Sequence, residues 1–269
     1  MIDSLSPIRS VAIGSFDGMH VAHKTLIAQA DAAVVIEQGT GYLTPGYKRA
    51  WYCDKPLLFY PIETIRMLGA SAFVERLRSD LPDLERIVVG YDFGFGHGRE
   101  GNADRLRRLF DGEVIIVDEV RLDGLSVHSR TIRTLLETGE IAAANRLLGR
   151  TYRIDGEVIA GQGIGSRELV PTLNLQVRDY QLPAEGVYAS RTRIGKQWYL
   201  SVSFTGHRRT TDGTLAVETH IIDRDIGQVS GRVWIAFEAY VRPNKTFSDL
   251  ASLKHQIMHD IAEVRKREE

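Results

Sequence analysis

The first half of the chain alternates short apolar runs with stretches of helical periodicity. Four β-branched runs are apolar on both faces, as buried parallel strands are, at residues 11–13, 33–36, 87–89 and 114–117. Helical spacing lies between them, at residues 20–30, 62–68, 72–81 and 102–110, and Asn102 is a suitable N-cap for the last helix. Residues 39–56 have no clear period and are predicted to form a loop. This order of elements predicts a parallel α/β sheet.

The pattern changes at Gly149-Arg150, after two short predicted helices at residues 129–136 and 141–148. Beyond this point polar and apolar residues alternate with period two, as in Trp198, Leu200, Val202 and Phe204 against Tyr199, Ser201 and Ser203. Similar alternation covers residues 152–160, 215–221 and 229–241. About six strands separated by Gly-rich turns predict an antiparallel barrel or sandwich.

An amphipathic helix closes the chain, with one apolar stripe formed by Leu250, Leu253, Ile257, Ile261 and Val264. The change of pattern divides the chain into two predicted domains, residues 1–149 and 150–269. A length of 269 residues, 43% of them hydrophobic, is enough for two such cores.

Net charge and cysteine content exclude several classes of function and binding site. Lys and Arg total 34 against 35 Asp and Glu, so no excess positive charge is available to bind nucleic acid, and any polyanion should be small and held locally. Cys53 is the single cysteine, which excludes an internal disulfide framework and multi-Cys metal sites. No apolar run approaches the ~20 residues that span a bilayer. We therefore expect a soluble, cytoplasmic protein without nucleic-acid or membrane partners, of undetermined oligomeric state.

A glycine-bearing turn follows the first predicted strand and leads into a helix with two histidines. The motif is Gly14-x-Phe16-Asp17-Gly18-x-His20-x-x-His23. A spacing of three places both imidazoles on one face of the first helical turn, where N–H groups and partial positive charge suit a phosphate. Two alternatives stay open: surface histidines that begin a helix by chance, and a metal site, which the lack of further His or Cys nearby disfavours.

A second glycine motif, Gly96-x-Gly98-x-x-Gly101 followed by acidic Asp118, matches the dinucleotide fingerprint of oxidoreductases. In that fingerprint the glycines directly follow a strand, whereas residues 91–95 intervene here. The chain contains no G-x-x-x-x-G-K-[ST] loop. An oxidoreductase is therefore a minor alternative, and a standard P-loop is excluded.

Three features of the second half carry candidate chemistry. Gly161-x-Gly163-x-Gly165 is a turn that could wrap a phosphate or simply close a hairpin. Thr172 and Asn174 share one face of an extended chain, where they could be oxygen ligands of magnesium or solvated turn residues. Glu218 and His220 point away from the face of Val217, Thr219 and Ile221, and a carboxylate there usually faces water.

These motifs together resemble the bifunctional prokaryotic riboflavin kinase/FMN adenylyltransferase (FAD synthetase) family. The histidine motif is similar to the family's G-x-F-D-G-x-H-x-G-H, residues 90–101 to G-x-D-F-x-F-G-x-x-R-x-G, and residues 145–150 to the link between its domains. Residues 171–175 resemble P-T-A-N-L, residues 217–223 resemble V-E-x-H-x-x-D, and residues 241–247 resemble the R-x-x-x-K-F ending. The matches are colinear along nearly the whole chain.

The resemblance implies a Rossmann-like nucleotidyltransferase domain with a parallel sheet. There His20 and His23 would stabilise charge on the ATP α-phosphate while the FMN phosphate attacks it, with no covalent enzyme intermediate. Asp92 and Phe93 would lie beside the flavin. Further ATP contacts would come from Gly14, Phe16, Asp17, Gly18, Ser129 and Arg133.

The resemblance further implies a C-terminal, six-stranded antiparallel riboflavin kinase barrel with a terminal helix. Glu218 would be the general base for the riboflavin 5′-hydroxyl, and Arg242 would contact the flavin. Thr172 and Asn174 would bind Mg²⁺ and ATP, together with Gly161, Gly163 and Gly165. ATP, riboflavin, FMN and FAD would be the substrates and products.

The sequence departs from the family pattern at several points. Ala22 replaces a glycine, Ser129-Arg130-Thr131 exchanges Thr and Arg, Leu169-Val170 replaces Gly-Phe, and Arg209 replaces a proline. Residues 39–60 are unlike the family's usual segment, so FMN contacts there cannot be transferred. Two alternatives follow: a riboflavin kinase with an impaired adenylyltransferase domain, and a flavin- or nucleotide-binding protein without turnover.

Overall fold

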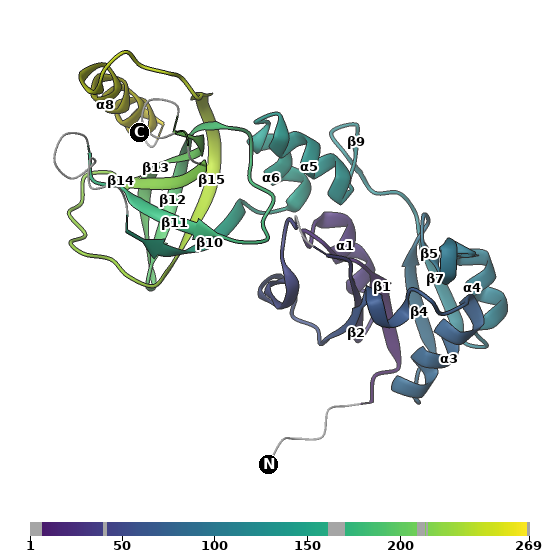
Figure 1. Ribbon diagram of the computed structural model, residues 1–269. Helices are drawn as coiled ribbons and strands as arrows, with labels where there is room; N and C mark the ends of the chain where they lie inside the picture. Colours follow the sequence, from purple (N-terminus) through teal and green to yellow (C-terminus); the bar gives the residue numbers. More distant parts are fainter. Residues whose placement is uncertain (1–6, 40–41, 161–169, 209–212, 214, 268–269) are drawn as a thin grey trace. The chain divides into compact units, whose positions relative to one another are not determined.

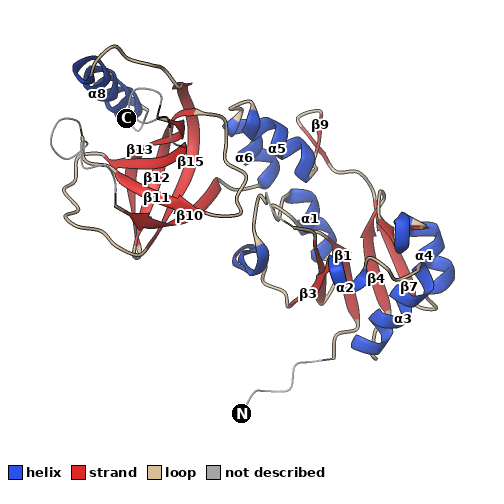
Figure 2. Cartoon of the chain, viewed as in Figure 1, coloured by secondary structure: helices blue, strands red, loops and turns tan. Residues whose placement is uncertain are grey.

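The computed structural model describes residues 7–39, 42–160, 170–208, 213 and 215–267 (Figures 1 and 2). The chain divides into two compact units, Met1–Thr131 and Ile132–Glu269. The division precedes the change of pattern at Gly149 because helix α6 (Ile141–Leu148) packs on barrel strands, where the Asn145 Nδ2 atom donates to the Phe237 carbonyl at 2.9 Å. The assignment of one activity to each side of residue 149 stays a prediction.

The first unit is built on a five-stranded parallel sheet in the order β3-β2-β1-β4-β7. The sequence predicted four of its strands: β1 (Ser10–Gly14), β2 (Ala32–Glu37), β4 (Arg86–Gly90) and β7 (Glu113–Val117). It missed edge strand β3 (Leu57–Pro61): the apolar run Leu57–Tyr60 is only four residues long, directly follows the segment without clear period, and ends in a proline, which is disfavoured inside a sheet. The predicted loop 39–56 contains a short helix, η1 (Gly46–Tyr52).

Helices cover both faces of the sheet, as the apolar strands predicted. On one face Val11, Ile13 and Val89 pack with α3 (Ala70–Asp80) and α4 (Ala103–Leu109). On the other face Ala12 and Val35 pack with α1 (Val21–Ile27). The short helix α2 (Ile62–Ile65) follows β3. Asn102 caps α4 as predicted, since its side chain accepts from the Arg105 amide at 2.8 Å.

Strand β1 lies in the middle of the sheet, and the chain builds outward from it in both directions. It continues to β2 and β3 on one side and then returns to β4 and β7 on the other. The carboxyl ends of β1 and β4 therefore flank the point where the strand order reverses, which is where open α/β sheets bind ligands. This topology brings the turn after Gly14 and the loop after Gly90 to the same edge of the sheet.

The second glycine motif lies in a hairpin of β5 (Gly94–Phe95) and β6 (Gly101–Asn102), closed by the 3-10 turn η2 (His97–Arg99). Another small hairpin pairs β8 (Arg121–Leu122) with β9 (Leu125–Ser126). A dinucleotide motif needs a long strand that leads directly into a helix. The geometry of residues 96–101 therefore does not support the oxidoreductase alternative.

The second unit contains the predicted six-stranded antiparallel barrel, closed in the order β10-β11-β14-β13-β12-β15. The strands are β10 (Tyr152–Ile159), β11 (Leu173–Val177), β12 (Gly186–Ile194), β13 (Gln197–His207), β14 (Leu215–Ile221) and β15 (Arg232–Pro243). The alternation pattern did not resolve β11 and β12 individually, and it began the last strand too early, at Val229. The predicted helices are α5 (Ser129–Glu137), α6 and the terminal α8 (Leu250–Lys266).

The barrel interior is partly polar. Ser190, Thr192, Ser201, Ser203 and Thr219 are at most 1% exposed and hydrogen-bond to one another through their hydroxyl groups. The apolar set of β13, which includes Leu200, Val202 and Phe204, lies outside the barrel, where Ile261 and Val264 of α8 cover it. The predicted alternation is therefore confirmed, but the serine face of β13 points inward.

Asp155 corrects the predicted pattern in β10. Period-two alternation over residues 152–160 puts Asp155 on the polar face with Arg153 and Glu157, yet it is only 4% exposed. Its carboxylate accepts from the Tyr180 hydroxyl at 2.5 Å and lies 3.4 Å from Arg232 Nε, so hydrogen bonding and an ion pair compensate its burial. Within the described part of the chain, no helix is long and apolar enough to cross a membrane.

Candidate active sites

The turn between β1 and α1 holds the two histidines together. Phe16, Gly18 and Met19 have positive φ angles of 49°, 87° and 42°, and full burial of the Phe16 and Met19 side chains holds this unusual backbone. His20 is the N-cap of α1, and its Nδ1 atom accepts from the His23 amide at 3.3 Å. The two imidazoles stack with centroids 3.4 Å apart, so the prediction that they share one face is confirmed.

The environment of His23 keeps its imidazole neutral at pH 7. Burial, followed by the charges of His20, Arg49 and His128, holds the pKa of His23 well below its usual 6.5. The His23 Nδ1 atom is buried without a hydrogen-bond partner among the described residues. Because His20 Nδ1 accepts this hydrogen bond, the donor atom of that ring is Nε2. The two rings can therefore offer hydrogen bonds to a ligand, and His23 brings no positive charge of its own.

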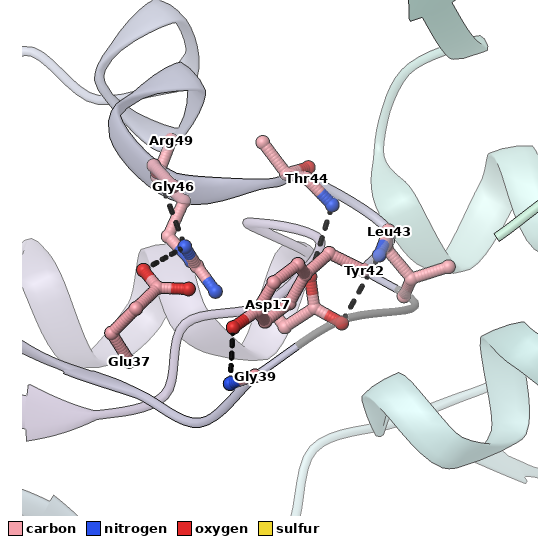
Figure 3. Close-up of polar contacts among 8 residues, drawn as sticks. All are labelled: Asp17, Glu37, Gly39, Tyr42, Leu43, Thr44, Gly46 and Arg49. Atoms are coloured by element: carbon pink, nitrogen blue, oxygen red, sulfur yellow. Dashed lines mark hydrogen bonds and ion pairs between the residues drawn. The ribbon is translucent and has the colours of Figure 1, made fainter. Parts of the chain in front are cut away.

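Asp17 binds a neighbouring segment of the same unit. Its carboxylate accepts from the amides of Leu43 and Thr44 at 3.1 and 2.9 Å, and it is 3% exposed (Figure 3). The Ser129 hydroxyl donates to the Asp17 carbonyl at 2.7 Å, which brings the start of α5 to the turn. Arg133 lies one helical turn further along α5. The direct ATP contacts predicted for these residues stay predictions.

Gly14, Asp92 and Phe93 lie at the carboxyl ends of β1 and β4. A side chain at Gly14 would meet the Phe16 ring at 3.3 Å, which accounts for the glycine. Asp92 is exposed, and the Phe93 ring stacks on Phe95 with centroids 5.4 Å apart. The sequence analysis did not single out Tyr91 in the same loop. Its hydroxyl lies 3.0 Å from His128 Nε2.

Arg49 is a second residue that the sequence analysis missed. It lies in η1 and is fully buried, and its Nη1 atom donates to Glu37 at 2.6 Å and to the Gly46 carbonyl at 3.1 Å (Figure 3). Its guanidinium carbon lies 5.0 Å from the centroid of the Tyr42 ring. No periodicity marks residues 39–56, so nothing in the sequence distinguished this arginine from a surface one.

A second cluster lies on neighbouring strands of the barrel. Asn174 on β11 and Glu218 on β14 occupy paired register positions. Arg208, directly after β13, donates from Nε to Glu218 Oε1 at 2.5 Å and from Nη2 to Asn174 Oδ1. Thr172 is half-buried just before β11. The structure therefore brings Asn174 and Glu218 together and adds Arg208, which was not among the predicted site residues.

Of the remaining predicted barrel residues, the structure describes Arg242 but not the three glycines. Arg242 donates from Nε and Nη2 to the two oxygens of buried Asp260 at 2.9 and 2.7 Å, which ties β15 to α8. A flavin contact by Arg242 stays a prediction. Gly161, Gly163 and Gly165 lie outside the described residues, as do the departures at Leu169 and Arg209.

The donor chemistry of the barrel cluster limits the kind of metal site it can form. Thr172 and Asn174 offer neutral oxygens, which suit Mg²⁺ when phosphate oxygens and water complete the coordination. Across the described ranges, no group of three or more His, Cys, Asp and Glu could hold a metal ion by protein ligands alone. Thr172 and Asn174 therefore fit Mg²⁺ that binds as a complex with a nucleotide.

Comparison with known proteins identifies the family. A riboflavin kinase family model matches residues 148–267, and an FAD synthetase family model matches residues 59–131. A bifunctional riboflavin kinase/FMN adenylyltransferase of Pseudomonas fluorescens is 30% identical over 94% of this chain and 91% of its own length. The chain belongs to the bifunctional riboflavin kinase/FMN adenylyltransferase family. The corresponding protein of Listeria monocytogenes is likewise 30% identical, over 95% of this chain and 91% of its own.

A solved structure has the same fold throughout. A protein from Streptococcus pneumoniae described as a macrolide-efflux protein matches 98% of this chain and 96% of its own, with a TM-score of 0.84 and 25% identity. In the present chain, the segment that matches the riboflavin kinase family model includes Thr172, Asn174, Glu218 and Arg242. The segment that matches the FAD synthetase family model includes Asp92 and Phe93, but it begins at residue 59, after the turn that holds His20 and His23.

Proposed function

We propose that this protein phosphorylates riboflavin to FMN in the barrel and adenylates FMN to FAD in the sheet unit, as a cytoplasmic enzyme. The observation that carries the proposal is the paired register of Asn174 and Glu218, which joins two separate family motifs into one cluster. The stacked His20 and His23 at the reversal point of the sheet support the second activity.

In the kinase reaction Glu218 accepts the proton of the riboflavin 5′-hydroxyl as that oxygen attacks the γ-phosphorus of ATP. The bond from the γ-phosphorus to the bridging oxygen breaks, and ADP leaves. Arg208 orients Glu218 and Asn174 through its two hydrogen bonds. Bound Mg²⁺, held by Thr172 and Asn174 with phosphate oxygens, would supply charge neutralisation at the transferred group.

In the adenylyl transfer an oxygen of the FMN phosphate attacks the α-phosphorus of ATP. The bond from the α-phosphorus to the bridging oxygen breaks, and pyrophosphate leaves. His20 and His23 donate hydrogen bonds to the oxygens on which charge develops, from a site whose backbone is already fixed. Ser129, whose hydroxyl donates to the Asp17 carbonyl of the same turn, would make a further phosphate contact.

Product chromatography tests both activities. Given riboflavin, ATP and magnesium, the protein should form FMN and then FAD with release of pyrophosphate. FMN without FAD would favour a kinase with an impaired adenylyltransferase, for which Ala22 in the first turn of α1 is the motivating observation. Neither product would overturn the proposal.

Glu218→Gln separates catalysis from binding. Loss of the base should lower ADP formation by about 10²–10⁴-fold while riboflavin affinity is retained. Glu157→Gln makes the same change at a half-exposed carboxylate on β10 and should leave the rate unchanged. Equal rates in the two variants would show that Glu218 is not the base.

A further inference from the structure

The guanidinium of Arg49 leaves one of its edges unused. Nη1 takes both protein acceptors, Glu37 and the Gly46 carbonyl. The Nε and Nη2 atoms are buried and have no hydrogen-bond partner among the described residues. These two nitrogens form one edge of the planar guanidinium and point their N–H groups in parallel, the arrangement that grips two oxygens of a phosphate or carboxylate.

Arg242 shows how the same edge is satisfied in a purely internal contact. Its Nε and Nη2 atoms donate to the two carboxylate oxygens of buried Asp260. Arg49 is more deeply buried than Arg242, with an exposed side-chain fraction of 0% against 13%, yet its edge has no such acceptor. Buried donors are rarely left unpaired, because each has given up its hydrogen bonds to water. Because no described residue supplies an acceptor to this edge of Arg49, it is suited to bind an anionic ligand.

The surroundings hold this edge in a fixed place. The Glu37 ion pair anchors the tip of the guanidinium, and the Tyr42 ring lies against it. The carboxylate of Asp17 fastens Leu43 and Thr44, the residues that precede η1, to the turn that leads into His20 (Figure 3). The charge of Arg49 contributes to the lowered pKa of His23, which places the two side chains within electrostatic reach. Arg49 can thus supply the fixed positive charge that the neutral His23 lacks.

We propose that Arg49 binds a phosphate group of a nucleotide substrate through its Nε–Nη2 edge, beside His20 and His23. The proposal rests on the adenylyltransferase activity proposed above. The ligand chemistry is a phosphate oxyanion, which either the triphosphate of ATP or the monoester of FMN could provide. Arg49 would then carry a binding contact in residues 39–60, the segment that departs from the family pattern.

Kinetics of the full-length protein test the proposal. Arg49→Lys keeps the positive charge and the ion pair with Glu37 but removes the two parallel N–H donors of the Nε–Nη2 edge. Arg49→Gln removes the charge as well. We expect the KM for ATP or for FMN in FAD formation to rise at least about tenfold in both variants. A rise for ATP identifies the triphosphate as the ligand, and a rise for FMN identifies the monoester. Arg107→Lys, at an exposed pair on α4, is the matched control.

Riboflavin phosphorylation by the same samples checks that the variants are folded, because that reaction uses the other unit. Unchanged KM values for both substrates would overturn the proposal. So would variants whose kinase activity and melting temperature collapse together, since Arg49 would then be structural. Calorimetric binding of inorganic pyrophosphate keeps this test separate from FAD formation. The wild type should bind it at least about tenfold more tightly than Arg49→Lys; equal binding, or none by the wild type, would overturn the proposal.

Discussion

Arg208 and Glu218 form an ion pair with 2.5 Å between Nε and Oε1, and their side chains are only 20% and 23% exposed. The same guanidinium donates to Asn174. Arg208 thereby fixes two residues of the proposed kinase site on separate strands, β11 and β14.

Replacing Arg208 with Met should lower kcat for riboflavin phosphorylation by at least about tenfold, because Glu218 and Asn174 lose the donor that orients them. ADP release measured at saturating ATP and riboflavin gives kcat directly. Arg178→Met, at an exposed arginine just after β11, should change nothing. An unaltered kcat in Arg208→Met would exclude the orienting role.

Asp260→Asn should destabilise the barrel unit by about 3–5 kcal/mol, since it leaves the mostly buried Arg242 guanidinium without its counter-charge. Urea denaturation followed by tryptophan fluorescence measures the change. Asp223→Asn breaks an exposed pair with Arg265 on the same helix and should cost less than about 1 kcal/mol. Similar losses in both variants would contradict the expectation.

Ser203→Ala should cost about 1–3 kcal/mol, because its hydroxyl bonds to Ser190 and Thr219 in the buried interior and these groups would lose a partner. The free energy of unfolding from denaturant titration is the measurement. Ser230→Ala, at an exposed position before β15, is the matched control. A neutral Ser203→Ala would mean that the hydroxyl network rearranges without loss.

The stability of the sheet unit should fall as the pH drops below 6.5. The pKa of His23 is lowered in the folded state, so the unfolded chain takes up a proton near pH 6.5 while the folded protein does not. The contribution is therefore present above that pH and is lost as the pH falls toward the lowered pKa. One such proton gives a slope of at most about 1.4 kcal/mol per pH unit.

Urea midpoints between about pH 7.5 and pH 5.5 measure this dependence. His23→Asn should flatten it, because the titrating ring is gone, whereas His255→Asn at an exposed position on α8 should not. Parallel pH curves for wild type and His23→Asn would show that other groups carry the effect.

The sequence by itself determined the elements whose pattern is local. Strands buried on both faces must be apolar throughout, so β1, β2, β4 and β7 were found, and a spacing of three was enough to predict that His20 and His23 share a face. Asn102 was recognised as a cap because capping needs only a side-chain oxygen and the amide three residues on. The family motifs likewise pointed to Asn174 and Glu218, although they lie far apart in the chain.

Only the tertiary structure decided which partner each buried polar group has. Period-two alternation fixes which residues of β13 share a face, but the inward direction of Ser201 and Ser203 depends on α8 covering the opposite face from the far end of the chain. In the same way, the sequence did not mark Arg49 at all, and it did not show which groups Asp17 and Arg242 bind inside the protein. The roles of Asp17 and Arg242 follow from the hydrogen-bond partners that folding brings near them. The role proposed for Arg49 follows from an edge to which the described residues bring no acceptor. Burial is a property of the packed chain, and residue order alone does not specify it.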